Sequence, residues 1–129
     1  MSMPYVVSQV VWNAKAVSET VVLKSELERC KIVVVEVTMA AFSGTVDLQG
    51  RISEVSAFSN VPWVRQDQAA AQTPSVSQIS ETTTTSVVRY VICGWWRQLR
   101  IVMTRSAGTI TCGVAGSSHA ELMPRIVVA

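Results

Sequence analysis

Apolar and polar side chains alternate with a period of two along most of the chain between residues 30 and 114. Val46 and Leu48 alternate with Asp47 and Gln49, and the same pattern returns at residues 98–104 and 109–112. Successive side chains of a strand point to opposite faces, so this pattern is typical of an antiparallel sheet with one buried face. We therefore predict an all-β protein, an antiparallel β-sandwich of jelly-roll type. The residues that alternate in phase predict one core, centred on Val33, Val35, Val46, Leu48, Leu99, Ile101, Met103 and Ile110.

Turn residues divide this pattern into about seven or eight short strands. Residues 31–40 form the most hydrophobic strand, and the continuous apolar run at 32–35 predicts burial on both faces. Ser43 and Gly44 have the composition of a two-residue hairpin turn that leads into a strand at 45–52. Ala107 and Gly108 predict a similar turn between strands at 97–105 and 109–115.

Other segments leave alternatives open. Residues 1–13 form an extended arm or a first strand, and residues 126–128 a last strand or an arm. Residues 15–29 form a strand followed by a turn, or a single helix, and the β-branched run at 20–22 favours the strand. Trp63 falls in the irregular stretch 53–72. No linker or repeat divides the chain, so residues 1–129 are predicted to be a single domain, with arms at 1–13 and 124–129.

The composition points to a surface that contacts other proteins. The chain has 129 residues, of which 49% are hydrophobic and only 16% charged, against about 25% charged residues in an average soluble domain. A small sandwich so poor in charge cannot cover all of its apolar strand faces by itself. We therefore expect a homo-oligomer, or a protein attached to a larger body.

Charge and cysteine content exclude several other classes. The net charge of +2 is too small to indicate nucleic-acid binding, and Arg89, Arg97, Arg100 and Arg105 alternate with apolar residues instead of forming a basic run. No basic segment followed by an apolar run marks a signal peptide, and no apolar stretch reaches the ~18 residues of a membrane span. The three cysteines, Cys30, Cys93 and Cys112, have no metal-ligand spacing and are expected to stay reduced.

No catalytic constellation is evident. His119 is the single histidine and lies in a predicted turn, so neither a histidine pair for a metal nor a Cys–His dyad is indicated. Asp47 and Glu54 could pair as acid and base, but exposed strand carboxylates are far more common. The glycines at 113 and 116 lack the lysine and helix of a phosphate loop. We predict no enzyme activity, no cofactor and no metal.

The tryptophans carry more information. Trp95 and Trp96 are adjacent, so a strand would direct one inward and the other outward, and Trp63 follows Pro62. An exposed indole anchors protein interfaces or stacks on a sugar ring. Contact with the core or another subunit is favoured over sugar stacking. The residues predicted for the interface are Trp12, Trp63, Trp95, Trp96, Arg97 and Arg100.

Two segments resemble a known group of proteins. Residues 45–52 (TVDLQGRI), followed by Val61, Pro62 and Trp63, resemble the strand, Leu-Gln-Gly, loop and Trp pattern of small β-sandwich proteins from tailed bacteriophages. Residues 89–91 and 96–101, followed by residues 108–111 (GTIT), resemble the later strands of the same proteins. The loop at 53–58 is longer and more apolar than the Asp-Gly turn that fibre modules often carry.

The resemblance implies a structural virion protein, made in the host cytoplasm and then attached to the particle. A capsid cement or decoration protein, which bridges capsomers of the major capsid protein, is the favoured member of this group. Cement proteins of this kind often occupy three-fold positions, so the resemblance favours a trimer. The alternatives are a tail, baseplate or fibre component, or a carbohydrate-binding module.

Overall fold

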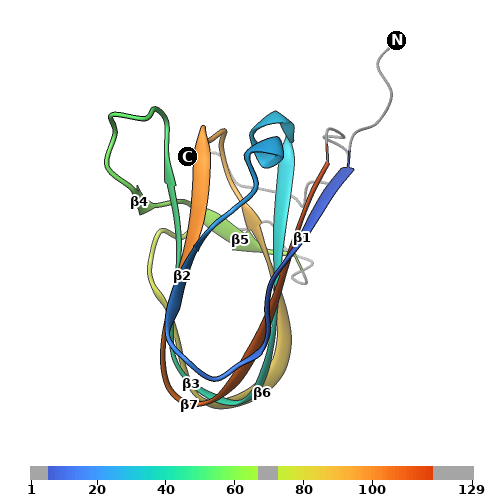
Figure 1. The fold of residues 1–129 in the computed structure, drawn as a ribbon, viewed down its shortest axis with the longest axis vertical. Helices are drawn as coiled ribbons and strands as arrows, with labels where there is room; N and C mark the ends of the chain where they lie inside the picture. The colour runs from blue at the N-terminus through green and yellow to red at the C-terminus, as the bar shows by residue number, and fades with distance from the viewer. Residues whose placement is uncertain (1–5, 67–72, 118–129) are drawn as a thin grey trace.

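The computed structural model describes residues 6–66 and 73–117, which form one seven-stranded antiparallel sheet and a short 3₁₀ helix, η1 (Ser25–Arg29) (Figure 1). The strand order is β1-β7-β3-β6-β5, with β2 paired to β7 and β4 paired to β3. This confirms the predicted all-β antiparallel class. The strands are β1 (Val6–Lys15), β2 (Glu19–Val22), β3 (Ile32–Arg51), β4 (Ser59–Asn60), β5 (Trp63–Arg65), β6 (Ile79–Ile92) and β7 (Gln98–Ser117).

The sandwich is made by folding this one sheet over on itself. The three long strands β3, β6 and β7 turn back at the lower end of Figure 1, so each contributes one half to each layer. In the first layer, β1 pairs with residues 110–117 of β7, and β5 pairs with the end of β6. In the second layer, β2 pairs with residues 100–103 of β7, and β4 pairs with the end of β3.

A row of irregular residues produces the bend. Ala14 in β1, Ala41 in β3, Thr83 in β6 and Gly108 in β7 all have φ between 47° and 74°, and the pairing register of the first three strands with their neighbours shifts near these positions. Such bulges increase twist and let a sheet turn a corner. Hydroxyl groups accept the amide hydrogens left unpaired there: Thr111 from Ala14, Thr85 from Ala41 and Ser43 from Thr83.

The two predicted hairpin turns are therefore wrong. Residues 31–40 and 45–52 belong to the single strand β3, and residues 97–105 and 109–115 belong largely to the single strand β7. Ser43 and Gly44, like Ala107 and Gly108, lie at bulges and not at chain reversals. A bulge and a tight turn require the same residue types, because both place a residue in the left-handed region and leave backbone groups for short side chains to satisfy.

The core lies between the two layers and has the predicted composition. All eight predicted residues are buried, and Val35, Ile101 and Ile110 are completely so. Phe42 fills the space inside the bend, where it is also fully buried. Within the run at 32–35, Ile32, Val33 and Val35 are buried and Val34 is partly buried, as expected for a strand covered on both faces.

The structure decides the secondary structure of the segments for which the sequence left alternatives open. Residues 6–13 belong to strand β1, and residues 15–29 contain β2 followed by η1 instead of a single helix. Trp63 lies in the short strand β5, not in a loop. His119 and the predicted arm at 124–129 lie outside the described residues.

Candidate functional site

Three segments meet at the end of the sandwich opposite the bend, and we call this surface the loop end: η1, residues 52–58 and residues 93–97 (Figure 1). The indole N–H of Trp95 donates a hydrogen bond to the carbonyl of Glu28 at 2.7 Å. Arg97 forms ion pairs with Glu28 and, at 3.5 Å, with Glu54. The backbone N–H of Arg97 also donates to the carbonyl of Arg51 at 3.0 Å. These contacts fix the three segments relative to one another.

Exposed apolar side chains surround this ion-pair cluster. Val55 is 96% exposed, Ile52 is 62% exposed and Trp95 is 56% exposed. Tryptophan and arginine are among the side chains that are enriched at protein interfaces and that contribute most of the binding energy there. Because the ion pairs and the Trp95 hydrogen bond already hold the loop end in place, a partner would pay less entropy to order it.

The structure places the predicted interface residues in different environments. Trp95 and Arg97 lie in the loop end. Arg100 is on the adjacent outer face of the second layer, with its guanidinium 4.1 Å from the ring centre of Phe58. Trp96 is partly buried: its N–H donates to the carbonyl of Cys93 at 2.9 Å, and a Cβ at Gly50 would lie 2.9 Å from its ring. The two adjacent tryptophans thus divide into an inner and an outer ring.

Trp63 and Trp12 are engaged within the chain. Trp63 is partly buried, packs edge-on against Tyr90 with ring centres 5.0 Å apart, and donates to the carbonyl of Ser77 at 3.2 Å. Trp12 is only 3% exposed, and its N–H donates to the Glu19 carboxylate at 2.8 Å. Trp12 is therefore a core residue of this fold and leaves the candidate interface, because the bulge after Val10 turns its side chain inward.

Sequence reasoning missed Ile52, Val55 and Phe58 as surface residues. The signal was present in the segment itself, because apolar residues in a short loop rich in serine have no strand face into which they could be buried. The sequence shows that the segment 52–58 is apolar, but its exposure depends on how the loop projects from the sheet. Phe58 is held between polar groups, with the Arg51 guanidinium 4.8 Å from its ring centre as well as that of Arg100.

The chemistry-bearing residues fall into separate local networks. Asp47 accepts hydrogen bonds from Gln78 and Asn60, whereas Glu54 pairs with Arg97, so the structure does not join the two carboxylates as an acid–base pair. Within residues 6–66 and 73–117, no three histidine, cysteine or acidic side chains gather as metal ligands. In the same part of the chain no helix has the length and apolar character needed to cross a membrane.

The three cysteines are free thiols. Cys30 and Cys112 are buried in the core, as predicted for Cys112, and Cys93 is half-buried. Burial raises the pKa of each thiol, and for Cys112, which also feels the charge of Glu36, the pKa rises to about 12. A thiol with so high a pKa is a poor nucleophile at neutral pH.

The fold places the chain among the antiparallel β-sandwich proteins. Among solved structures it is similar to the SPBc2 prophage-derived protein YomS, with a TM-score of 0.60 and 12% sequence identity, and the match covers 92% of this chain and 97% of that protein. No family model matches the chain, and no curated protein matches its sequence. At this identity the likeness concerns the fold, which the two chains share along nearly their whole lengths.

Proposed function

We propose that this chain is a structural protein of a tailed-phage particle, and specifically a capsid cement protein that binds the assembled shell through the loop end. The observation that carries the proposal is the shared fold with a prophage-derived protein over nearly the full length of both chains. The phage-like sequence patterns at residues 45–63 and 89–111 agree with it. The low charge content is the second support, since it suits a protein that works by contact.

In this proposal the protein acts as a rigid clamp. The folded-over sheet holds η1 and the loops at 52–58 and 93–97 in one fixed arrangement. The major capsid protein binds the exposed side chains of Trp95, Val55 and Ile52. Each contact is small, but repetition over a shell makes the summed effect large. The protein would thus raise the temperature at which the shell opens without changing any substrate.

Particles with and without the protein test this role directly. We expect particles that lack the protein to be closed but to release DNA at a lower temperature, measured with a DNA-binding dye during heating. Addition of purified protein should restore the original release temperature. Particles that are equally heat-resistant without the protein, yet fail to adsorb to cells, would contradict the cement role and support the tail, baseplate or fibre alternative.

Surface variants test whether the loop end makes the contact. Val55→Asp and Trp95→Ala should each abolish co-sedimentation with particles that lack the protein, because hot-spot side chains at an interface centre dominate affinity. Val17→Asp is the matched control, since Val17 is also exposed but lies in the β1–β2 connection at the bend. Equal binding by all three variants would exclude the loop end.

Sugar binding is the second candidate, and the exposed indole of Trp95 is the observation that favours it. A glycan array would show a defined set of bound sugars, and Trp95→Ala would abolish that binding. A blank array, together with particle binding, would leave the cement role as the better account.

A further inference from the structure

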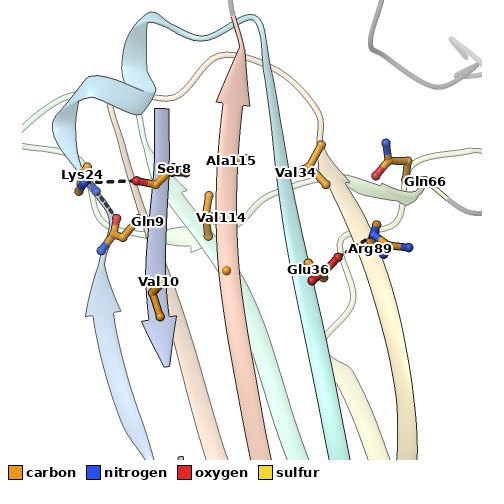
Figure 2. Close-up of a pocket in the computed structure, with 11 residues that line it drawn as sticks. Ser8, Gln9, Val10, Lys24, Val34, Glu36, Gln66, Arg89, Val114 and Ala115 are labelled. Atoms are coloured by element: carbon orange, nitrogen blue, oxygen red, sulfur yellow. Dashed lines mark hydrogen bonds and ion pairs between the residues drawn. The ribbon is translucent and has the colours of Figure 1, made fainter. Parts of the chain in front are cut away.

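The outer face of the first layer carries mainly small and apolar side chains, and its arginine is already paired. A groove of about 860 Å³ lies on this face, with Val10, Val34 and Ala115 among its lining residues (Figure 2). Arg89 also lines the groove, where it donates to the Glu36 carboxylate at 2.7 Å (Figure 2). The two charges therefore balance each other within the chain.

The outer face of the second layer is polar instead. Arg100 donates to the side-chain oxygen of Gln49 at 2.8 Å, Gln49 donates to Asn60 at 3.2 Å, and Asn60 donates to Asp47 at 3.4 Å. The acceptor of the Arg100 guanidinium is thus a neutral amide. In the described part of the chain, no carboxylate lies within ion-pair distance of Arg100. Its positive charge is therefore not balanced by a direct partner.

A pocket of about 280 Å³ lies next to this face, where the three segments of the loop end meet. We call it the arginine pocket, and it is lined by Ser25 of η1, Arg51, Glu54, Arg97 and Gln98. Its volume is just below the ~300–1,000 Å³ of pockets that hold drug-sized ligands, so it suits a single side chain.

Arg51 brings a second unbalanced charge to this pocket. Its Nε donates to the side-chain oxygen of Gln98 at 2.9 Å, and its Nη1 donates to the carbonyl of Glu54 at 3.3 Å, so both acceptors are neutral. Among the described residues no carboxylate forms an ion pair with Arg51. A guanidinium has five N–H groups, so Arg51 can donate to a further acceptor without losing these bonds.

The two unbalanced guanidiniums are held close to each other. Those of Arg51 and Arg100 lie 4.8 Å and 4.1 Å from the ring centre of Phe58. Like charges held against one ring repel each other, and an anion bound beside them lowers that repulsion. Because hydrogen bonds and the ring already fix both side chains, such an anion would meet donors that are largely preorganised.

Glu54 is the member of the pocket that can give way. Its carboxylate is 3.5 Å from Arg97, and its side chain is 78% exposed. Arg97 keeps its ion pair with Glu28 when Glu54 moves. An exposed ion pair at this distance contributes little to stability. Glu54 can therefore turn toward solvent and leave its place beside Arg97 to another carboxylate.

We propose that the arginine pocket binds the carboxylate of an aspartate or glutamate side chain on the major capsid protein, an inference that rests on the proposed cement role. The carboxylate accepts from Arg51, whose planar guanidinium can donate two parallel hydrogen bonds to it. Ser25 and Gln98 carry further donor groups in the pocket wall. Apolar side chains of the loop end, Val55 and Trp95 among them, exclude water around this contact and so strengthen it.

Binding of arginine variants to particles that lack the protein tests the pocket. Arg51→Gln should weaken binding about tenfold, because it removes a charge-assisted pair from a contact that excludes water. Arg51→Lys should recover only part of that loss, since an ammonium group lacks the planar fork. Arg89→Gln is the matched control and should leave binding unchanged, because Arg89 is paired with Glu36 on the first layer. Thermal melts check that each variant keeps the fold.

Glu54→Gln should change binding in the opposite direction. It removes the charge that repels an incoming carboxylate and frees Arg97, so binding should tighten about threefold. Raising the NaCl concentration from about 0.05 M to 0.5 M should weaken binding of the wild type more than that of Arg51→Gln, because salt screens the pair that the variant lacks. If Arg51→Gln fails to fold, Glu54→Gln still tests the pocket.

The outcomes separate the pocket from the cement role. Wild-type protein that does not bind the particles would overturn both. Binding that is insensitive to Arg51→Gln, or that is unchanged or weakened by Glu54→Gln, would overturn the pocket alone. The loop end would then bind the shell through its apolar side chains.

Discussion

The row of left-handed residues at the bend predicts that Gly108→Ala strongly destabilises the protein. Gly108 has a φ of 74°, a region that residues with a Cβ rarely adopt. A Cβ there would lie 2.6 Å from the carbonyl oxygen of Ala40 in β3 and closer still to that of Ala41. These are backbone atoms, so no side-chain rotation can remove the overlap.

The expected loss of stability has two parts. A left-handed backbone costs a residue with a Cβ about 1–2 kcal/mol. Relief of the overlap requires a shift of β3 against β7, and forced shifts in a packed interior cost about 1–3 kcal/mol. The sum is about 2–5 kcal/mol. For a chain of this size each kcal/mol lowers the melting temperature by roughly 4 °C, so the drop in Tm should be about 8–20 °C.

Gly113→Ala on the same strand is the matched control. Its φ lies outside the left-handed region, and the nearest atom to an added Cβ is the carbonyl oxygen of Gln9 at 3.9 Å, an ordinary contact. Alanine in place of a mid-strand glycine should stabilise by about 0.5–1 kcal/mol, because the unfolded chain loses freedom. Urea unfolding, followed by tryptophan fluorescence at low protein concentration so that association contributes little, measures both variants.

The signs of the two changes in unfolding free energy test whether the bend depends on a glycine at position 108. Opposite signs support the bulge geometry, and Ala41→Gly should then stabilise by up to about 1 kcal/mol by removing left-handed strain from β3. If Gly108→Ala cost less than about 1 kcal/mol, or if both glycine variants behaved alike, the bend would not depend on a glycine at position 108 and the reasoning would be refuted.

Three further predictions concern the core, the cysteines and pH. Ile101→Ala should cost about 2–5 kcal/mol in urea unfolding, because its fully buried side chain would leave a cavity, and a loss below about 1 kcal/mol would contradict its place in the core. Iodoacetamide at pH 8 should label Cys93 before Cys112 under native conditions, as mass spectrometry can follow, since burial raises the pKa of Cys112 to about 12; equal rates would contradict this order. The Lys15 ammonium and the Trp12 N–H hold the pKa of Glu19 below its ordinary value of 4.5. This pairing therefore stabilises the fold above pH 4.5 and is lost as the pH falls through the lowered value. Glu19→Gln should flatten that acid dependence in thermal melts, and an unchanged slope would exclude the contribution.

The sequence by itself determined the strand class and the core. The alternation of Val46 and Leu48, or of Leu99, Ile101 and Met103, follows directly from the two-residue repeat of a strand, and every one of these side chains is buried. This information is local, because the face to which a side chain points depends only on its place within its own strand. Trp95 and Arg97 are among the residues that the sequence predicts for the interface, but the sequence left open which of the two adjacent tryptophans points outward.

Only the tertiary structure decided how the strands are connected and which residues share a surface. The same Ser-Gly and Ala-Gly pairs suit a hairpin or a bulge, and the neighbouring strand selects between them: Ala41 and Thr83 are held in their left-handed conformations by the hydroxyls of Thr85 and Ser43, which lie about 40 residues away in sequence. Trp12 could not be assigned to the core in advance, because a bulge reverses the face to which it points. The contrast between an apolar and a polar outer face likewise exists only once the folded sheet has placed β1, β3 and β7 side by side, since packing across strands is not encoded in any one segment.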